Sequence, residues 1–198
     1  RFKNWVDNTN IFQYLGIHYV DIIYFATNAK PIRVLATAQK NYLLRMGINN
    51  YDAIQAVIQW QMQSGNTFTS SFFTNWIDPE CTSAMSEQSI KVIGTTGRYE
   101  ADQKKRGIFI VDDGVIEEPN PDFCMSYGLK KGEISYKGYG IDSVVQFLED
   151  ISNIEQGRIK VEELEGKRPT FNVSIIPTMV IEAVNKSLSE NGQWVELL

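Results

Sequence analysis

Cysteine and histidine are both scarce in this sequence, which has two cysteines and one histidine in 198 residues. Two cysteines, Cys81 and Cys124, are too few for a disulfide framework in a domain of this size, and neither lies in a C-x-x-C spacing. A single histidine with two distant cysteines supplies no recognisable zinc ligand set, and it leaves serine or cysteine nucleophile chemistry without separate partners. We therefore predict reduced cysteines, a cytoplasmic location and no bound metal.

Long apolar runs and clusters of positive charge are also lacking. No apolar run reaches the roughly 18 residues that span a bilayer, and no basic segment precedes an apolar one at the start. The chain carries 24 acidic against 19 basic residues, a net charge of -5, and its longest basic run is residues 104–106. The sequence thus predicts neither a membrane nor a nucleic acid as partner.

What is present is the composition of an ordinary globular protein, with 43% hydrophobic and 22% charged residues. A chain of this length forms one domain by default, so we expect a single domain over residues 1–198. The sequence opens at Arg1 rather than at a methionine, which we interpret as the start of a fragment excised from a larger protein.

The order of elements predicts an α+β fold. Residues 11–26 are apolar at nearly every position, which predicts a mostly buried helix with Asn8 and Thr9 as candidate caps. From Pro31 the residues favour a strand, and residues 53–63 alternate between an apolar face and an opposite face of four glutamines with Ala53 and Val57, as in a sheet packed on one face only.

A second polar-faced strand is expected after a hairpin turn at Gly65 and Asn66. Phe68, Phe72 and Trp76 share one face of it. Further strands are predicted over residues 89–93, 107–111 and 115–118, with a turn at Asp113 and Gly114, and helices over 141–154 and 175–188, with Pro177 in a first turn. The whole predicts a large, mainly antiparallel sheet, open on one face, with helices packed on the other.

Two glycine-containing segments resemble nucleotide-binding loops only superficially. Residues 138–143 read G-x-G-x-x-S before a helix, but the third glycine is absent and the preceding stretch is too polar for a buried parallel strand. Residues 94–97 read GTTG and fit a phosphate loop or a turn. We favour a turn in both places, and a solvated hairpin for the acidic residues between 112 and 122.

His18 is the most informative residue, because it is the only histidine and lies within an apolar helix. Tyr14 lies four residues before it on the same helix face, and Asp21, three residues after it, can accept its second ring proton. A hydroxyl, an imidazole and a carboxylate on adjacent turns suit proton transfer at an alcohol or carbonyl carbon. The alternative is a core histidine satisfied by Asp21 or by a backbone carbonyl, and the spacing leaves both open.

Residues 10–21, which read NIFQYLGIHYVD, resemble the signature helix that opens the C-terminal domain of the glucose-fructose oxidoreductase and inositol dehydrogenase (Gfo/Idh/MocA) family. The resemblance continues at residues 30–34 and 93–97 and ends at 168–169, 181–183 and 187–188, so it covers nearly the whole chain. It implies a mainly antiparallel sheet that is normally preceded by a Rossmann domain holding NAD or NADP. That nucleotide-binding domain is absent from this sequence.

The resemblance also implies roles for individual residues. In the family a lysine of the preceding domain and a histidine matching His18 flank the substrate hydroxyl, and hydride passes to the nicotinamide. Many family members have an aspartate where this sequence has Tyr14, a departure that weakens the catalytic assignment, since a phenol is a poorer base at neutral pH. The candidate catalytic residues are His18 and Tyr14, and the candidate substrate-binding residues are Gln13, Asp21, Arg98, Lys137 and Tyr139.

Two functions follow as hypotheses. In the first, the parent protein is an NAD(P)-dependent oxidoreductase acting on a hydroxyl or carbonyl of a sugar, cyclitol or related polyol, and this chain supplies substrate contacts but is inactive alone. In the second, the chain is a catalytically degenerate domain that builds a homo-oligomer. In either case we expect the open, glutamine-rich and threonine-rich sheet face to pair with another copy.

Overall fold

The computed structural model describes residues 3–78, 87–102, 107–112, 115–117, 125–128 and 133–197. The chain divides into two compact units, a first unit of Arg1–Glu80 with Glu165–Leu198 and a second unit of Cys81–Leu164. Cys81, Cys124 and the turn predicted at Asp113 and Gly114 lie outside the described residues.

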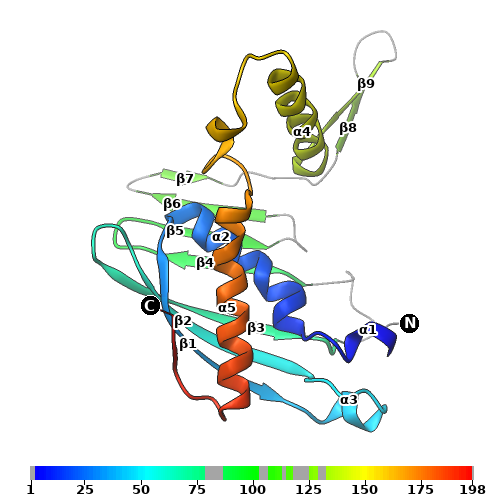
Figure 1. The fold of residues 1–198 in the computed structure, drawn as a ribbon, viewed down its shortest axis with the longest axis vertical. Coiled ribbons are helices and arrows are strands. Elements are labelled where there is room, and N and C mark those ends of the chain that lie inside the picture. Colours follow the sequence, from blue (N-terminus) through cyan, green and yellow to red (C-terminus); the bar gives the residue numbers. More distant parts are fainter. Residues whose placement is uncertain are drawn as a thin grey trace. The chain divides into compact units, whose positions relative to one another are not determined.

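The first unit is an antiparallel sheet covered by helices (Figure 1). Its strands stand in the order β10-β1-β2-β3, and each neighbouring pair is antiparallel. The elements are α1 (Lys3–Val6), η1 (Phe12–Gly16), α2 (Ile17–Thr27), β1 (Lys30–Gln39), α3 (Tyr42–Arg45), β2 (Ala53–Gln61), β3 (Thr67–Asn75), α5 (Phe171–Ser189) and β10 (Val195–Glu196).

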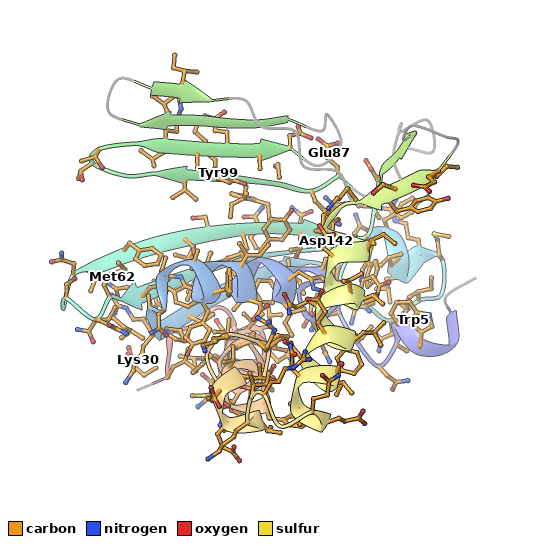
Figure 2. The ribbon with its side chains drawn as sticks, turned by 90° about the horizontal axis from the view of Figure 1, so that it is seen from above. Trp5, Lys30, Met62, Glu87, Tyr99 and Asp142 are labelled. Carbon is orange, nitrogen blue, oxygen red and sulfur yellow. The ribbon has the colours of Figure 1, made fainter. Side chains whose placement is uncertain are left out.

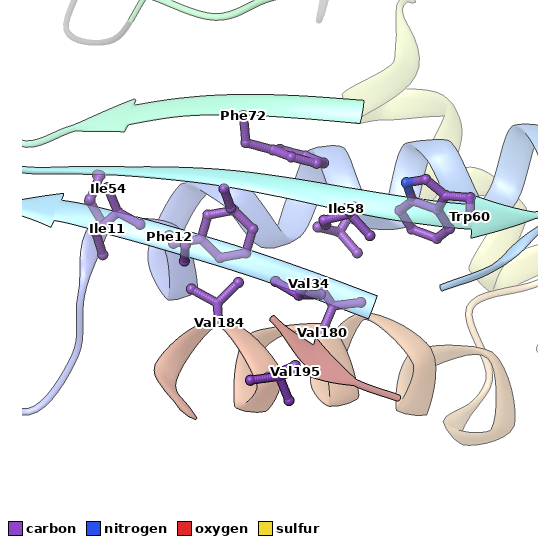
Figure 3. Close-up of a cluster of buried hydrophobic side chains, with 14 of the residues drawn as sticks. Ile11, Phe12, Val34, Ile54, Ile58, Trp60, Phe72, Val180, Val184 and Val195 are labelled. Carbon is purple, nitrogen blue, oxygen red and sulfur yellow. The ribbon is translucent and has the colours of Figure 1, made fainter. Parts of the chain in front are cut away.

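The core of the first unit lies between the sheet and the two long helices α2 and α5 (Figure 3). Along β2 the side chains of Ile54, Ile58 and Trp60 are fully buried, whereas the glutamines that alternate with them lie on the other face. Val20 of α2 and Val180 of α5 complete the same core. The alternation predicted for residues 53–63 is therefore confirmed, because period two places every second side chain on one face.

The hairpin predicted at Gly65 and Asn66 is also confirmed. The N–H of Met62 donates to the carbonyl oxygen of Asn66 at 2.8 Å, and Gln61 pairs with Thr67. Gly65 has a φ of +87°, which a residue without a Cβ adopts at little cost.

The second unit contains two further antiparallel sheets. One has the order β4-β5-β6-β7 and the other pairs β8 with β9. The elements are β4 (Ser89–Ile93), β5 (Arg98–Asp102), β6 (Gly107–Asp112), β7 (Val115–Glu117), β8 (Met125–Gly128), β9 (Ile134–Lys137), α4 (Tyr139–Glu155) and η3 (Val161–Leu164). The α+β class with a mainly antiparallel strand arrangement is confirmed, although the described strands are distributed over three sheets and β5, β8 and β9 were not predicted.

The two glycine segments differ in the structure. The N–H of Gly94 donates to the carbonyl oxygen of Gly97 at 2.8 Å, which closes the turn between β4 and β5, so the turn predicted at residues 94–97 is confirmed. Gly138 joins β9 to α4, but residues 139–143 form the start of α4, so the turn predicted at residues 138–143 is wrong beyond Gly138. The strand before this segment, β9, pairs antiparallel with β8 rather than lying in a parallel βαβ unit.

Three further details of the sequence analysis were wrong. The cap of the first long helix is Asn10 rather than Asn8 or Thr9, since Asn10 Oδ1 accepts the N–H of Gln13 at 2.9 Å. Pro177 lies inside α5, which begins at Phe171, and not in a first turn.

The helix over residues 11–26 is not mostly buried, contrary to the prediction: Val20 is the buried residue of α2, and Phe25 is 79% exposed. An apolar sequence cannot show which side of a helix faces the sheet, so the burial was overestimated.

Candidate functional site

The helix that carries the candidate residues begins with a π-helical turn, η1, and continues as α2. The N–H of Ile17 donates to the carbonyl oxygen of Phe12, five residues earlier. Gly16 permits this turn, because a Cβ at Gly16 would lie 2.8 Å from the ring of Phe12, which is fully buried. Single π turns inside helices are frequent at functional sites.

The π turn changes the angle about the helix axis that separates the side chains of Tyr14 and His18. Four residues of an α-helix overshoot one full turn by about 40°. A π turn holds more residues and so advances less per residue, which offsets part of that overshoot. Tyr14 and His18 therefore lie on one face of the helix, one turn apart.

This face is accessible to solvent. Tyr14 is 49% exposed, His18 is exposed, and Asp21 is partly exposed. The hypothesis that His18 is a satisfied core histidine is wrong, because its side chain is not in the core. Among the hydrogen bonds of the described residues, none joins His18 to Tyr14 or to Asp21, so the imidazole is not oriented by either neighbour.

Tyr14 lies in an aromatic cluster that the sequence analysis did not find. Its ring centroid is 5.2 Å from those of both Trp5 and Trp76, and the two tryptophan rings are 5.9 Å apart. Trp5 is 37% exposed and Trp76 is partly buried. The three rings come from α1, from η1 and from the residue after β3, so no local spacing signals that they meet.

Gln13 is exposed on η1, next to Tyr14. Its backbone N–H is held by Asn10, whose side-chain amide also donates to Asn185 of α5 at 2.7 Å. The start of the helix is thus fixed to the end of α5. Gln13, Tyr14, His18 and Asp21 all belong to the first unit.

Arg98, Lys137 and Tyr139 belong to the second unit. Arg98 Nε lies 3.3 Å from Glu100 Oε1, and Lys91 Nζ lies 2.9 Å from the same oxygen. The hydrogen bond from Lys91 is the main cause that lowers the pKa of Glu100, and Arg98 adds to it. Lys137 ends β9 and Tyr139 begins α4, both exposed. A substrate contact for these three residues stays a prediction.

Neither a metal site nor a membrane span is found in the described part of the chain. No three metal-ligating side chains gather there. Within the same ranges, none of the helices combines the length and apolar character needed to traverse a bilayer. A surface groove on α5 and β10 includes Met179, Glu182 and Lys186, and it holds none of the predicted site residues.

No protein-family model and no curated protein matches the chain. Several solved structures do match the chain. An oxidoreductase from Sinorhizobium meliloti is 15% identical with a TM-score of 0.70, over 98% of this chain and 54% of that one. An inositol dehydrogenase homologue from Azotobacter vinelandii, complexed with NADH and myo-inositol, is 14% identical with a TM-score of 0.67, over 94% and 49%. A super-repressor mutant of Gal80p from Saccharomyces cerevisiae is 16% identical with a TM-score of 0.63, over 96% and 50%.

The chain therefore has the fold of about half of each of these three proteins, and it spans about half the length of the structures that it matches. This agrees at the level of the fold with the resemblance carried by residues 10–21, and it is consistent with a C-terminal domain.

Proposed function

We propose that this chain is the substrate-side half of a two-domain NAD(P)-dependent oxidoreductase that acts on a hydroxyl or carbonyl of a sugar, cyclitol or related polyol. The observation that carries the proposal is the accessible pair of Tyr14 and His18 on one face of a helix that opens with a π turn. The likeness to a structure complexed with NADH and myo-inositol supports the class of reaction.

The cofactor belongs to a preceding domain in this proposal. All described strand pairs are antiparallel, so the described residues do not fit a dinucleotide, which needs a βαβ unit with a glycine-rich turn at a helix N-terminus. A nicotinamide held by that other domain would supply the hydride acceptor.

The chain's own residues would handle the proton. Oxidation of an alcohol removes a hydride from carbon and a proton from oxygen, and an imidazole accepts protons near neutral pH. His18 would take the hydroxyl proton and return it in the reverse reaction. Tyr14, one turn away, would donate a hydrogen bond to the substrate oxygen or relay the proton to solvent, with Gln13 and Asp21 holding neighbouring hydroxyls.

We expect the 198-residue chain alone to bind neither NAD nor NADP with useful affinity. Isothermal titration calorimetry of the chain against each nucleotide tests this, with the full-length protein as the positive control. Micromolar binding to the chain alone would show that the glycine segment at residues 138–143 has been misread.

A second candidate function is a structural one, in which the open face of the first unit's sheet pairs with another copy. Phe73 of β3 is 76% exposed on that face, opposite Gln55 of β2. A polar face carrying an exposed aromatic ring remains soluble alone and can bury a standard interface in a dimer.

Light scattering tests the association. We expect the full-length protein to be at least a dimer, and Phe73→Glu to lower its molar mass towards that of the monomer. Phe25→Glu is the matched control, because Phe25 is as exposed but lies on α2, the helix side. A strict monomer at high concentration contradicts the proposal.

A further inference from the structure

The turn between β1 and β2 presents three large apolar side chains to solvent. Tyr42, Leu44 and Met46 are each more than half exposed, on or next to the short helix α3. Figure 2 shows Lys30 and Met62 at one end of this unit's sheet, and α3 lies at the other end, where β1 finishes. Contiguous apolar surface of this kind is uncommon on a soluble protein unless it contacts a partner. We call residues 41–48 the apolar turn.

The apolar turn is fixed at both of its ends. At its start the buried carboxylate of Asp52 accepts three successive backbone N–H groups. At its end the N–H of Ile48 donates to the carbonyl oxygen of Leu43 at 2.9 Å. Gly47, with a φ of +77°, donates to the carbonyl oxygen of Leu44 at 3.0 Å, and the two bonds together form a Schellman motif. A surface that is already ordered loses little conformational entropy when it binds, so the turn is a preformed contact.

The groove on α5 and β10 has a matching apolar lining. The lining side chains are buried or partly buried and come from Met179, Ala183, Val195 and Leu197. The volume of the groove is about 210 Å³, below the roughly 300 Å³ at which small-molecule sites begin. The groove therefore suits a protruding side chain of a protein better than a free ligand.

The charges of the two surfaces are opposite. Residues 40–48 carry two cations and no acidic residue. The groove is flanked by Glu182 and Glu196 and by one cation, Lys186. Neither of these two carboxylates takes part in an ion pair among the described residues. Arg45 of the turn would therefore meet a net negative charge at the groove, which favours this pairing over others.

The apolar turn lies too far along β1 to fill the groove of its own chain. Val195 of the groove pairs with Val34 of β1, whereas the turn follows Gln39 at the end of that strand. Residues 34 to 39 span five steps of about 3.3 Å, or roughly 17 Å. Only another molecule can place such a turn in the groove, and a second copy of this chain carries one.

We infer that the protein associates with a second copy of itself by placing Leu44 and Met46 of the apolar turn in the groove of the partner, with Arg45 facing the partner's Glu182. In a two-fold dimer this contact is made twice, because each copy supplies one turn and one groove. The groove lies at the β10 edge of the sheet, so this contact is distinct from pairing through the open face.

Disulfide trapping in the full-length protein tests the contact directly. Leu44→Cys combined with Met179→Cys should give a disulfide-linked dimer under mild oxidation. Each single variant, and the wild-type protein with only Cys81 and Cys124 in this chain, should lack that dimer. Bridged Cα atoms lie within about 7 Å of each other, so a link between the two new cysteines reports turn and groove in contact. A double variant that links no more than the single variants would overturn the inference.

Light scattering gives a second measurement that does not depend on cysteine chemistry. Leu44→Glu should halve the molar mass of the full-length assembly, because an unpaired charge does not enter an apolar groove. Val161→Glu is the matched control, since Val161 is 61% exposed but lies on η3, and it should leave the mass unchanged. Equal effects of the two substitutions, or no effect of Leu44→Glu, would contradict the contact.

A charge exchange tests the orientation of the two copies. Arg45→Glu should weaken association about fivefold, the scale of one exposed ion pair. Adding Glu182→Arg to that variant should restore the affinity, which damage to α3 alone would not allow. A double variant that associates no more tightly than Arg45→Glu excludes this pairing. Phe73→Glu, which alters the open face, should leave the disulfide trapping unchanged, so the two modes of association succeed or fail separately.

Discussion

Replacing His18 by asparagine is expected to lower the turnover of the full-length protein by about 100-fold or more, the usual scale for losing a positioned proton-transfer group. Asparagine keeps a polar side chain on the helix but cannot accept the hydroxyl proton. Because His18 is exposed, the fold should survive the change, with the free energy of unfolding altered by no more than about 0.5 kcal/mol.

Steady-state kinetics and thermal unfolding of the same preparations check this expectation. Full activity of His18→Asn on a substrate that the wild-type protein oxidises would exclude His18 from the chemistry.

Tyr14→Phe tests whether the hydroxyl of Tyr14 takes part in the proposed chemistry. Phenylalanine keeps the ring that contacts Trp5 and Trp76, so the cluster should persist while the hydroxyl is lost. A lower turnover with an unchanged unfolding temperature would assign the hydroxyl to proton relay or orientation. Unchanged turnover would assign Tyr14 to packing against Trp5 and Trp76 alone.

The first unit was the more predictable part of the fold, and its sequence shows why. The period-two alternation in β2 and the turn at Gly65 are local signals, and both are present in the structure. In the second unit the short strands β5, β8 and β9 contain few apolar residues, and each pairs with a strand that is next to it in the sequence. A strand this short with so few apolar residues shows no clear period-two alternation of apolar and polar side chains.

The candidate site was predicted in part. His18 and Tyr14 were found because their spacing on one helix is a local property. The exposure of these two side chains was not predicted, because it depends on which side of the helix faces the sheet. Trp5 and Trp76 were missed as partners of Tyr14 because their contacts join separate elements, and contacts of that kind leave no short-range signal.

Asp52 is a further residue that the sequence did not single out. It directly precedes β2, and its carbonyl oxygen accepts the backbone N–H of Trp76 at 2.9 Å. Its buried carboxylate accepts the backbone N–H groups of Asn41, Tyr42 and Leu43, each at 2.7 Å, and so caps the short helix α3. Burial by itself raises the pKa of Asp52, but these three hydrogen bonds, with the nearby charge of Arg45, outweigh it and lower that pKa below its ordinary value.

We expect Asp52→Ala to lower the free energy of unfolding at pH 7 by about 2–3 kcal/mol, because it removes a charged acceptor and a helix cap together. Asp7→Ala is the matched control: Asp7 accepts one backbone N–H, from Asn49 at 3.2 Å, but is exposed, so its loss should cost at most about 0.5 kcal/mol. Urea unfolding of both variants gives the comparison.

The acid dependence of the Asp52 effect has a definite sign. Because the pKa of Asp52 is lower in the folded state than in the unfolded chain, the charged carboxylate stabilises the fold above the unfolded value of about 3.9. That contribution is lost as the pH falls through the folded-state pKa. The gap in unfolding free energy between the wild-type protein and Asp52→Ala should therefore narrow below about pH 4. A gap that stays constant from pH 7 to pH 3, or one that widens on acidification, would show that the hydrogen bonds to α3 do not depend on the charge of Asp52.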